Sequence, residues 1–134
     1  MTKADDQLTP QERELETRLK ATGIPAKQYV VDEHDCDDFA FRAYHRLRSQ
    51  YEGQVGVKWY KYNEADGTEV GHALNFIDWP DGTRTYIEPQ SGDVVTLPEP
   101  RVQTFESKDP EVVNQKQHEV TTIEVERWLK SLGQ

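Results

Sequence analysis

The middle of the chain carries a pattern of turns and alternating side chains that leaves few options besides an antiparallel sheet. Residues 55–62 alternate between apolar and polar positions, which is the period of a strand with one buried face. A Pro-Asp-Gly sequence at 80–82 separates a largely apolar run at 70–79 from a further strand-like run at 83–88, and this spacing is typical of a three-residue hairpin loop. We therefore predict antiparallel strands over these three runs, with a short fourth strand at 93–97.

Helix signals flank the predicted strands on both sides. Thr9 suits an N-cap, because Pro10 follows at the first helical position and Glu12 completes a capping box. An apolar face near the other end predicts a helix over 121–133, and the polar segment 98–120 before it is predicted to be irregular surface. Because helices and strands occupy separate parts of the chain, the predicted fold class is α+β.

The only cysteine of the chain lies at the predicted start of a further helix. Asp35 suits an N-cap, and apolar residues recur at helical spacing from Phe39 to Tyr51, so this helix is expected to run from Cys36 to about Glu52. At a helix start, unpaired backbone N–H groups and the helix dipole favour a thiolate. Three neighbouring aspartates oppose it by charge repulsion. The alternative is an inert, packed cysteine, since free cysteine is among the most buried residue types.

Composition narrows the classes of function. A length of 134 residues suits one domain, and a single cysteine excludes an internal disulfide and any multi-cysteine zinc site. The formal net charge of −9 argues against nucleic-acid binding, which needs clustered lysine and arginine. The sequence contains no apolar run that suits a signal peptide or a membrane span, so we expect a cytoplasmic protein without membrane contact. A phage-encoded protein would look the same, and the oligomeric state is not indicated.

The predicted hairpin register brings a histidine close to two polar residues of the next strand. If Trp79 pairs with Thr83, counting outward places His72 opposite Gln90. Glu88 then lies on the same sheet face along the diagonal, about 7–8 Å away between backbones. Because a glutamate side chain can close this gap, either Glu88 or Gln90 is a candidate partner for the imidazole.

Cysteine, histidine and a third polar group form the set that nucleophilic thiol chemistry requires. Cys36 would attack the substrate, while His72 would take the proton and later return it to the leaving group. Glu88, or Gln90 in its place, would fix the tautomer of the imidazole and stabilise its charged form. We therefore expect these residues to converge on one site.

Two alternatives to a catalytic site stay open. His34, Cys36 and His72 could bind zinc with a carboxylate, but a His-x-Cys pair at a helix start matches known ligand spacings poorly, so we expect no metal or other cofactor. The second alternative is a binding module, whose recognition surface would come from aromatic residues that could equally pack in the core: Trp59, Tyr60, Tyr62 and Trp79.

The sequence resembles the transglutaminase-like cysteine peptidases of the papain-like superfamily, particularly the small bacterial ones. Their catalytic helix begins with Cys-Asp/Glu-Asp-Phe/Tyr-Ala, and residues 36–40 read Cys-Asp-Asp-Phe-Ala. The family also places a histidine on a strand and an acid on the next strand, where His72 and Glu88 stand. The likeness covers about residues 28–97, and the cysteine motif is its most specific part.

This resemblance implies a fold and an activity. The fold would be a papain-like core over 28–97, with the cysteine helix packed on a small antiparallel sheet, inside a single domain over 1–134. The activity would be that of a thiol-dependent hydrolase or acyltransferase that acts on amide bonds of a protein or peptide through Cys36, His72 and Glu88. Gln28 is the upstream side chain available to an oxyanion hole. The family's third member is usually aspartate, so the glutamate here is one methylene longer.

Overall fold

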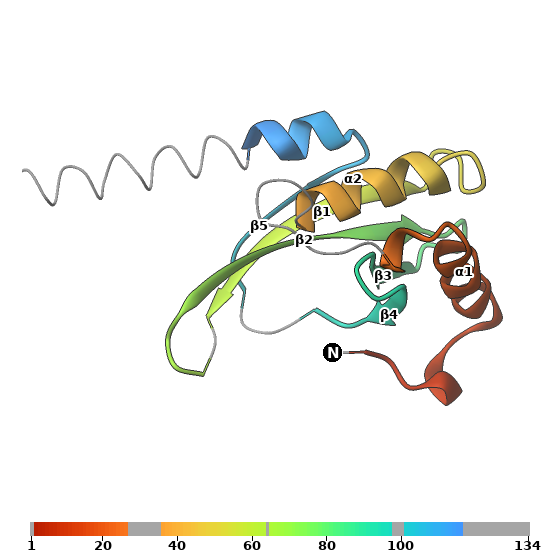
Figure 1. Ribbon diagram of the computed structural model, residues 1–134, viewed down its shortest axis with the longest axis horizontal. Helices are drawn as coiled ribbons and strands as arrows, with labels where there is room; N and C mark the ends of the chain where they lie inside the picture. Colours follow the sequence, from red (N-terminus) through yellow and green to blue (C-terminus); the bar gives the residue numbers. More distant parts are fainter. Residues whose placement is uncertain (1, 27–35, 64, 98–100, 117–134) are drawn as a thin grey trace, which may run out of the picture.

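The computed structural model describes residues 2–26, 36–63, 65–97 and 101–116 (Figure 1). Within these residues, an antiparallel sheet has the strand order β4-β3-β2-β1-β5. Its strands are β1 (Val55–Asn63), β2 (Glu69–Asp78), β3 (Arg84–Glu88), β4 (Asp93–Val95) and β5 (Arg101–Ser107). The helices are the 3-10 turns η1 (Asp5–Gln7) and η2 (Ile24–Ala26) and the α-helices α1 (Pro10–Ala21) and α2 (Cys36–Leu47).

The predicted N-terminal helix is confirmed as α1, and its start has the expected chemistry. The Thr9 hydroxyl accepts the Glu12 N–H at 3.2 Å, and the Glu12 carboxylate accepts the Thr9 N–H at 3.1 Å. Two of the N–H groups that every helix leaves unpaired are thereby satisfied. Gly23 follows the helix with φ of +79°, a left-handed conformation that favours glycine over other residues.

The second helix begins where the sequence predicted and ends earlier. Its first residue is Cys36, but it stops at Leu47 rather than near Glu52, and turns then lead to Gly53 at φ +74°. Tyr51 is buried even though it lies beyond the helix. The apolar spacing therefore correctly indicated which residues are buried, but the last of them lie in the turns after the helix.

The predicted hairpin register is confirmed. The Trp79 N–H donates to the Thr83 carbonyl at 2.9 Å across the Pro-Asp-Gly loop, and the ladder then pairs Asp78 with Arg84. Each further step outward follows the same count, so the pairing of β2 with β3 rests on the loop chemistry alone.

The segment predicted to be irregular is partly regular. Residues 101–107 form β5, which pairs with β1, and residues 110–116 are helical. Phe105 explains why the strand forms, because its ring stacks on that of Trp59 with centroids 4.9 Å apart. Val113 is buried against the same cluster. The predicted helix over 121–133 lies outside the described residues.

Helix α2 covers one face of the sheet over β1 and β2 (Figure 1). Asn75, which is fully buried, joins the two layers: its amide donates to the Ala40 carbonyl of α2 at 2.9 Å and to the Gly56 carbonyl at 3.3 Å. Because side chains alternate along a strand, His72 points to the sheet face opposite to Asn75, as the sequence predicted.

Candidate functional site

His72 of β2 and Glu88 of β3 are in direct contact. The imidazole Nε2 lies 2.6 Å from the carboxylate Oε2 of Glu88. This is the diagonal contact that the hairpin count allowed, and it favours Glu88 over Gln90 as the partner of the imidazole. Gln90 lies beside the pair instead, where its backbone N–H donates to the other carboxylate oxygen at 3.3 Å.

The contact occupies one of the two imidazole nitrogens. Because an ionised carboxylate only accepts hydrogen bonds, the geometry suits the tautomer in which Nε2 of His72 donates to Glu88. Nδ1 is then the nitrogen left for contact with another group. The two side chains are 22% and 17% exposed, so solvent or a ligand reaches them.

A tyrosine of β1 forms one wall of this site. Tyr60 pairs with His72 across the ladder, and the two rings meet edge to face with centroids 5.7 Å apart. The ring of Tyr62 lies next to that of Tyr60, with the two ring centroids 5.8 Å apart. The imidazole is thus held by a carboxylate from one neighbouring strand and by an aromatic ring from the other.

The remaining predicted site residues lie largely outside the described part of the chain. The backbone of Cys36 begins α2 as expected, but its side chain and the whole of Gln28 and His34 are not among the described residues. The convergence of the cysteine sulfur with the imidazole therefore stays a prediction. Within the described residues, no group of three histidine, cysteine or acidic side chains is arranged to hold a metal ion.

The predicted aromatic recognition surface is wrong, because most of its members pack inside the protein. Trp59, Tyr60 and Trp79 are 5%, 6% and 8% exposed. Trp59 stacks on Phe105, and the Trp79 indole N–H donates to the Thr85 hydroxyl at 2.8 Å. These rings serve the core, as the alternative interpretation of the sequence held.

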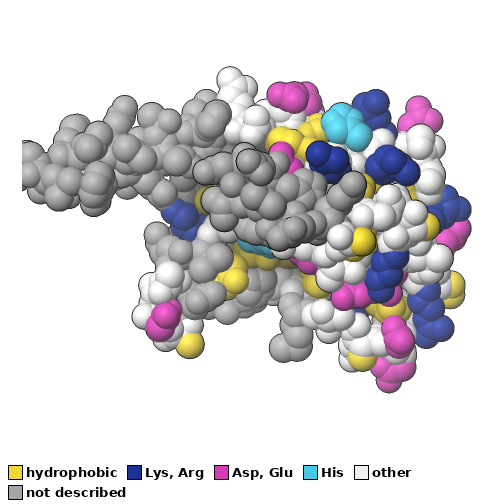
Figure 2. Space-filling model, viewed as in Figure 1, with side chains coloured by type: hydrophobic (Ala, Val, Ile, Leu, Met, Phe, Trp, Pro, Cys, Tyr) yellow, Lys and Arg dark blue, Asp and Glu magenta, His cyan; other side chains and the backbone are white. Residues whose placement is uncertain are grey.

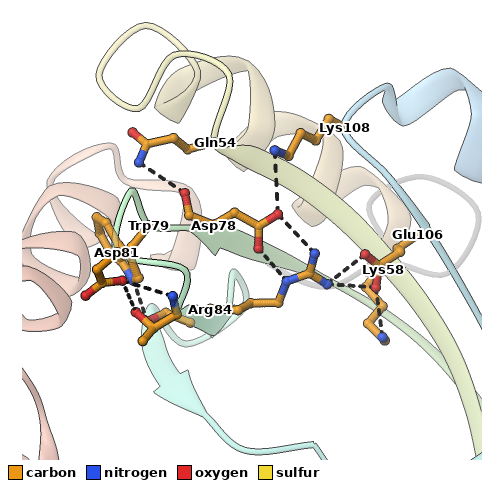
Figure 3. Close-up of polar contacts among 10 residues, drawn as sticks. Gln54, Lys58, Asp78, Trp79, Asp81, Arg84, Glu106 and Lys108 are labelled. Atoms are coloured by element: carbon orange, nitrogen blue, oxygen red, sulfur yellow. Dashed lines mark hydrogen bonds and ion pairs between the residues drawn. The ribbon is translucent and has the colours of Figure 1, made fainter.

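The same sheet face carries a charge network that the sequence analysis missed (Figure 3). Arg84 of β3 pairs with Asp78 through Nη2 at 3.0 Å and with Glu106 of β5 at 2.7 Å. Lys58 of β1 also pairs with Glu106, at 3.0 Å, so the network spans four neighbouring strands. The hairpin register pairs Asp78 with Arg84, but Lys58 and Glu106 lie too far from them in the sequence for a local pattern to reveal the network.

The hydrogen bonds of this network stabilise the charged forms of Arg84 and Asp78. Burial disfavours the charged form of Arg84, but the carboxylates of Asp78 and Glu106 outweigh it and raise the pKa of the guanidinium. The Arg84 hydrogen bond in turn is the main cause that lowers the pKa of Asp78. Each of these charges already has a partner on this chain, so we assign the network to the fold rather than to ligand binding.

Comparisons with known proteins give no family. No family model matches the chain, and no curated protein matches it. Among solved structures, Polyporus squamosus lectin bound to the human-type influenza-binding epitope Neu5Aca2-6Galb1-4GlcNAc matches with a TM-score of 0.48 and 20% identity, covering 63% of this chain and 32% of that chain. A structure described as "PSL1a-E64 complex" matches with a TM-score of 0.48 and 21% identity, covering 65% and 34%. The chain therefore spans about a third of the length of these matched chains.

These comparisons contradict the family resemblance. One matched structure is described as a lectin and no family model matches the chain, so the predicted membership is not supported and is withdrawn. The papain-like core assigned to 28–97 is not supported either. The physical reason lies in the length of the motif: a helix start with a cysteine and a hairpin with a histidine and an acid are short features that do not transfer between families.

The predicted activity was implied by this resemblance, so it loses its support together with it. No family model and no curated protein supports a thiol-dependent hydrolase or acyltransferase with a Cys36–His72–Glu88 catalytic triad. The contact between His72 and Glu88 does not depend on that assignment, because it follows from the hairpin register. It is the observation on which a functional proposal can be built.

Proposed function

We propose that this protein is a binding module that recognises a polar group of a protein or peptide partner at the His72–Glu88 pair. The observation that carries the proposal is the 2.6 Å contact between two half-buried ionisable side chains on the sheet face opposite α2. The half-buried Tyr62 lies next to Tyr60 and adds aromatic surface of the kind enriched at recognition sites, whereas Tyr60 itself is buried and supports the imidazole from β1.

The energetics of the pair favour a role in recognition over a role in folding. Removing two ionisable groups from water costs several kcal/mol per ion, so an ion pair of this kind adds little net stability. His72 and Glu88 join β2 to β3, which the backbone ladder already connects. The Arg84 network differs, because it ties together strands from β3 to β5. A pair that the fold does not need, yet holds in one geometry, suits a partner that covers it.

The proposal extends to the location of the protein and to the classes of partner it binds. The acidic net charge disfavours nucleic acid as the partner. Among the described residues, no helix combines the length and apolar character needed to cross a bilayer. We place the protein in the cytoplasm, with a phage-encoded origin as an alternative source, and with no membrane partner.

A selection from a displayed peptide library tests the binding proposal. Peptides enriched on the wild-type protein should lose at least about tenfold in affinity when His72→Ala or Glu88→Gln is introduced, equal to about 1.4 kcal/mol. Arg48→Ala is the control, because it removes an exposed polar side chain elsewhere, directly after α2. Enriched peptides that bind all variants equally would place recognition at another surface.

A catalytic use of the same pair is the second candidate, and the geometry of His72 favours it. With Glu88 held at Nε2, Nδ1 is presented as the basic nitrogen, which is what a general base requires. The two candidates separate in one experiment: the mass of a selected peptide is measured after incubation with the wild type and with His72→Ala. A mass change caused only by the wild type would establish an enzyme, whereas an unchanged peptide would leave the binding module.

A further inference from the structure

A second site with a different character lies on α2. Arg42, His45 and Arg46 line a pocket of about 310 Å³ together with Thr22 and Ile24, which lie between α1 and the end of η2. Positions separated by three and four residues share one side of a helix, so the two arginines and the histidine lie on the same side of α2. Figure 2 shows Lys or Arg side chains gathered around a histidine over α2.

These cations lack the partners that other cations of this protein have. Lys20 pairs with Asp93, and Arg18 pairs with Glu14. Among the described residues, by contrast, no ion pair or side-chain hydrogen bond reaches Arg42, His45 or Arg46. Such an arrangement is unexpected in a chain with 25 acidic and 16 basic residues, where a carboxylate partner is easy to supply.

Stability does not account for the cluster. Like charges four residues apart, as in Arg42 and Arg46, destabilise a helix by about 0.2–0.5 kcal/mol. The helix dipole offsets part of this cost for His45 and Arg46, which lie in the last turn, but acts weakly on Arg42 one turn earlier. The helix itself therefore gains little from placing these side chains together.

We propose that this pocket binds a phosphate group of a small phosphorylated molecule. Two guanidinium groups can each donate a pair of parallel N–H bonds to phosphate oxygens, and the N–H of the imidazole adds a further donor. A phosphate dianion balances the two arginines, whereas a single carboxylate leaves one of them unpaired. The pocket volume is at the small end of the range for ligand sites, which suits a compact phosphate ester.

Titration with free O-phosphoserine tests the proposal, with serine and inorganic phosphate as companion probes. We expect saturable shifts of the backbone amide resonances of Arg42 and Arg46 with O-phosphoserine and with inorganic phosphate, and none with serine. Arg42→Gln and Arg46→Gln should each weaken binding about tenfold, the loss expected for one charge-assisted bidentate contact. Circular dichroism of each variant confirms that α2 still forms.

Arg48→Gln is the matched control, because it removes the same charge near the end of α2 but outside the pocket lining. It should change the affinity for O-phosphoserine less than twofold. Equal weakening by Arg48→Gln would reveal attraction to the general charge of this region and would overturn the site. Shifts that do not saturate, or that serine reproduces, would overturn it as well. Peptide binding at His72 is a separate property, so either result leaves that proposal intact.

Discussion

Gly56 of β1 should be intolerant of even one added methyl group. A Cβ atom built on Gly56 would lie 2.1 Å from Cζ of the Phe76 ring, far inside van der Waals contact. The ring cannot retreat freely, since Phe76 is 1% exposed and the Arg84 guanidinium lies 3.9 Å above its centroid. A shift of the ring would therefore also disturb the ion pairs that Arg84 makes with Asp78 and Glu106.

The size of the effect follows from these contacts. Overpacking of a filled core costs about 1–3 kcal/mol, and a weakened, partly exposed ion pair costs about 0.2–1 kcal/mol. We therefore expect Gly56→Ala to lower the free energy of unfolding by about 2–3 kcal/mol, a large part of the 5–15 kcal/mol typical of a domain. Urea denaturation followed by far-UV circular dichroism measures this difference.

A compensating variant separates the clash from other effects of the substitution. Phe76→Leu makes room where the added methyl group would sit, so Gly56→Ala combined with Phe76→Leu should be more stable than the sum of the two single changes predicts. The reasoning is refuted if Gly56→Ala unfolds at the wild-type urea midpoint, or if the two changes are strictly additive.

Two further predictions concern the acid dependence of stability and the cysteine. Burial opposes ionisation of Glu12, but hydrogen bonds from Thr85, Thr9 and Lys3 outweigh it and lower its pKa below 4.5. A lowered folded-state pKa stabilises the protein above the unfolded pKa, and this contribution is lost as the pH falls through the folded value. Unfolding measured between about pH 6 and 3 should therefore lose stability less steeply in Glu12→Gln than in the wild type; parallel curves would contradict this assignment. Cys36 stays a candidate site residue at the start of α2: iodoacetamide should alkylate it faster than free cysteine at neutral pH if the helix start favours its thiolate, and slower alkylation would indicate a packed cysteine.

Local chemistry in the sequence predicted much of the secondary structure. The capping box at Thr9 and Glu12 gave the start of α1, and the Pro-Asp-Gly loop gave the register that brings His72 to Glu88. Both features depend on residues within a few positions of one another, so the sequence displays them directly.

Features that depend on distant residues were not predictable in this way. Strand β5 is mostly polar, and what holds it is pairing with β1 and the stacking of Phe105 on Trp59. The ion pair between Lys58 and Glu106 joins residues 48 positions apart. The basic pocket on α2 also depends on tertiary structure, because Ile24 and Thr22 complete a cluster whose helical half alone looks like an ordinary solvated face.

The family assignment failed for a related reason. A short cysteine motif and two residues on a hairpin fix local geometry, and the same local geometry occurs in unrelated proteins. The division into one domain over 1–134 stays a prediction. What the sequence supplied was the position of His72 beside Glu88 or Gln90, without its purpose, and the structure selects Glu88.

The most direct test of the account replaces both members of this pair with apolar residues of similar size. In the double variant His72→Phe, Glu88→Leu, the proposed recognition group is lost while two strands remain joined by their ladder. We predict a free energy of unfolding within about 1 kcal/mol of the wild-type value, with binding of selected peptides weakened at least about tenfold. A variant that unfolds much more easily while binding its peptides unchanged would contradict the central claim, because the pair would then serve the fold and not recognition.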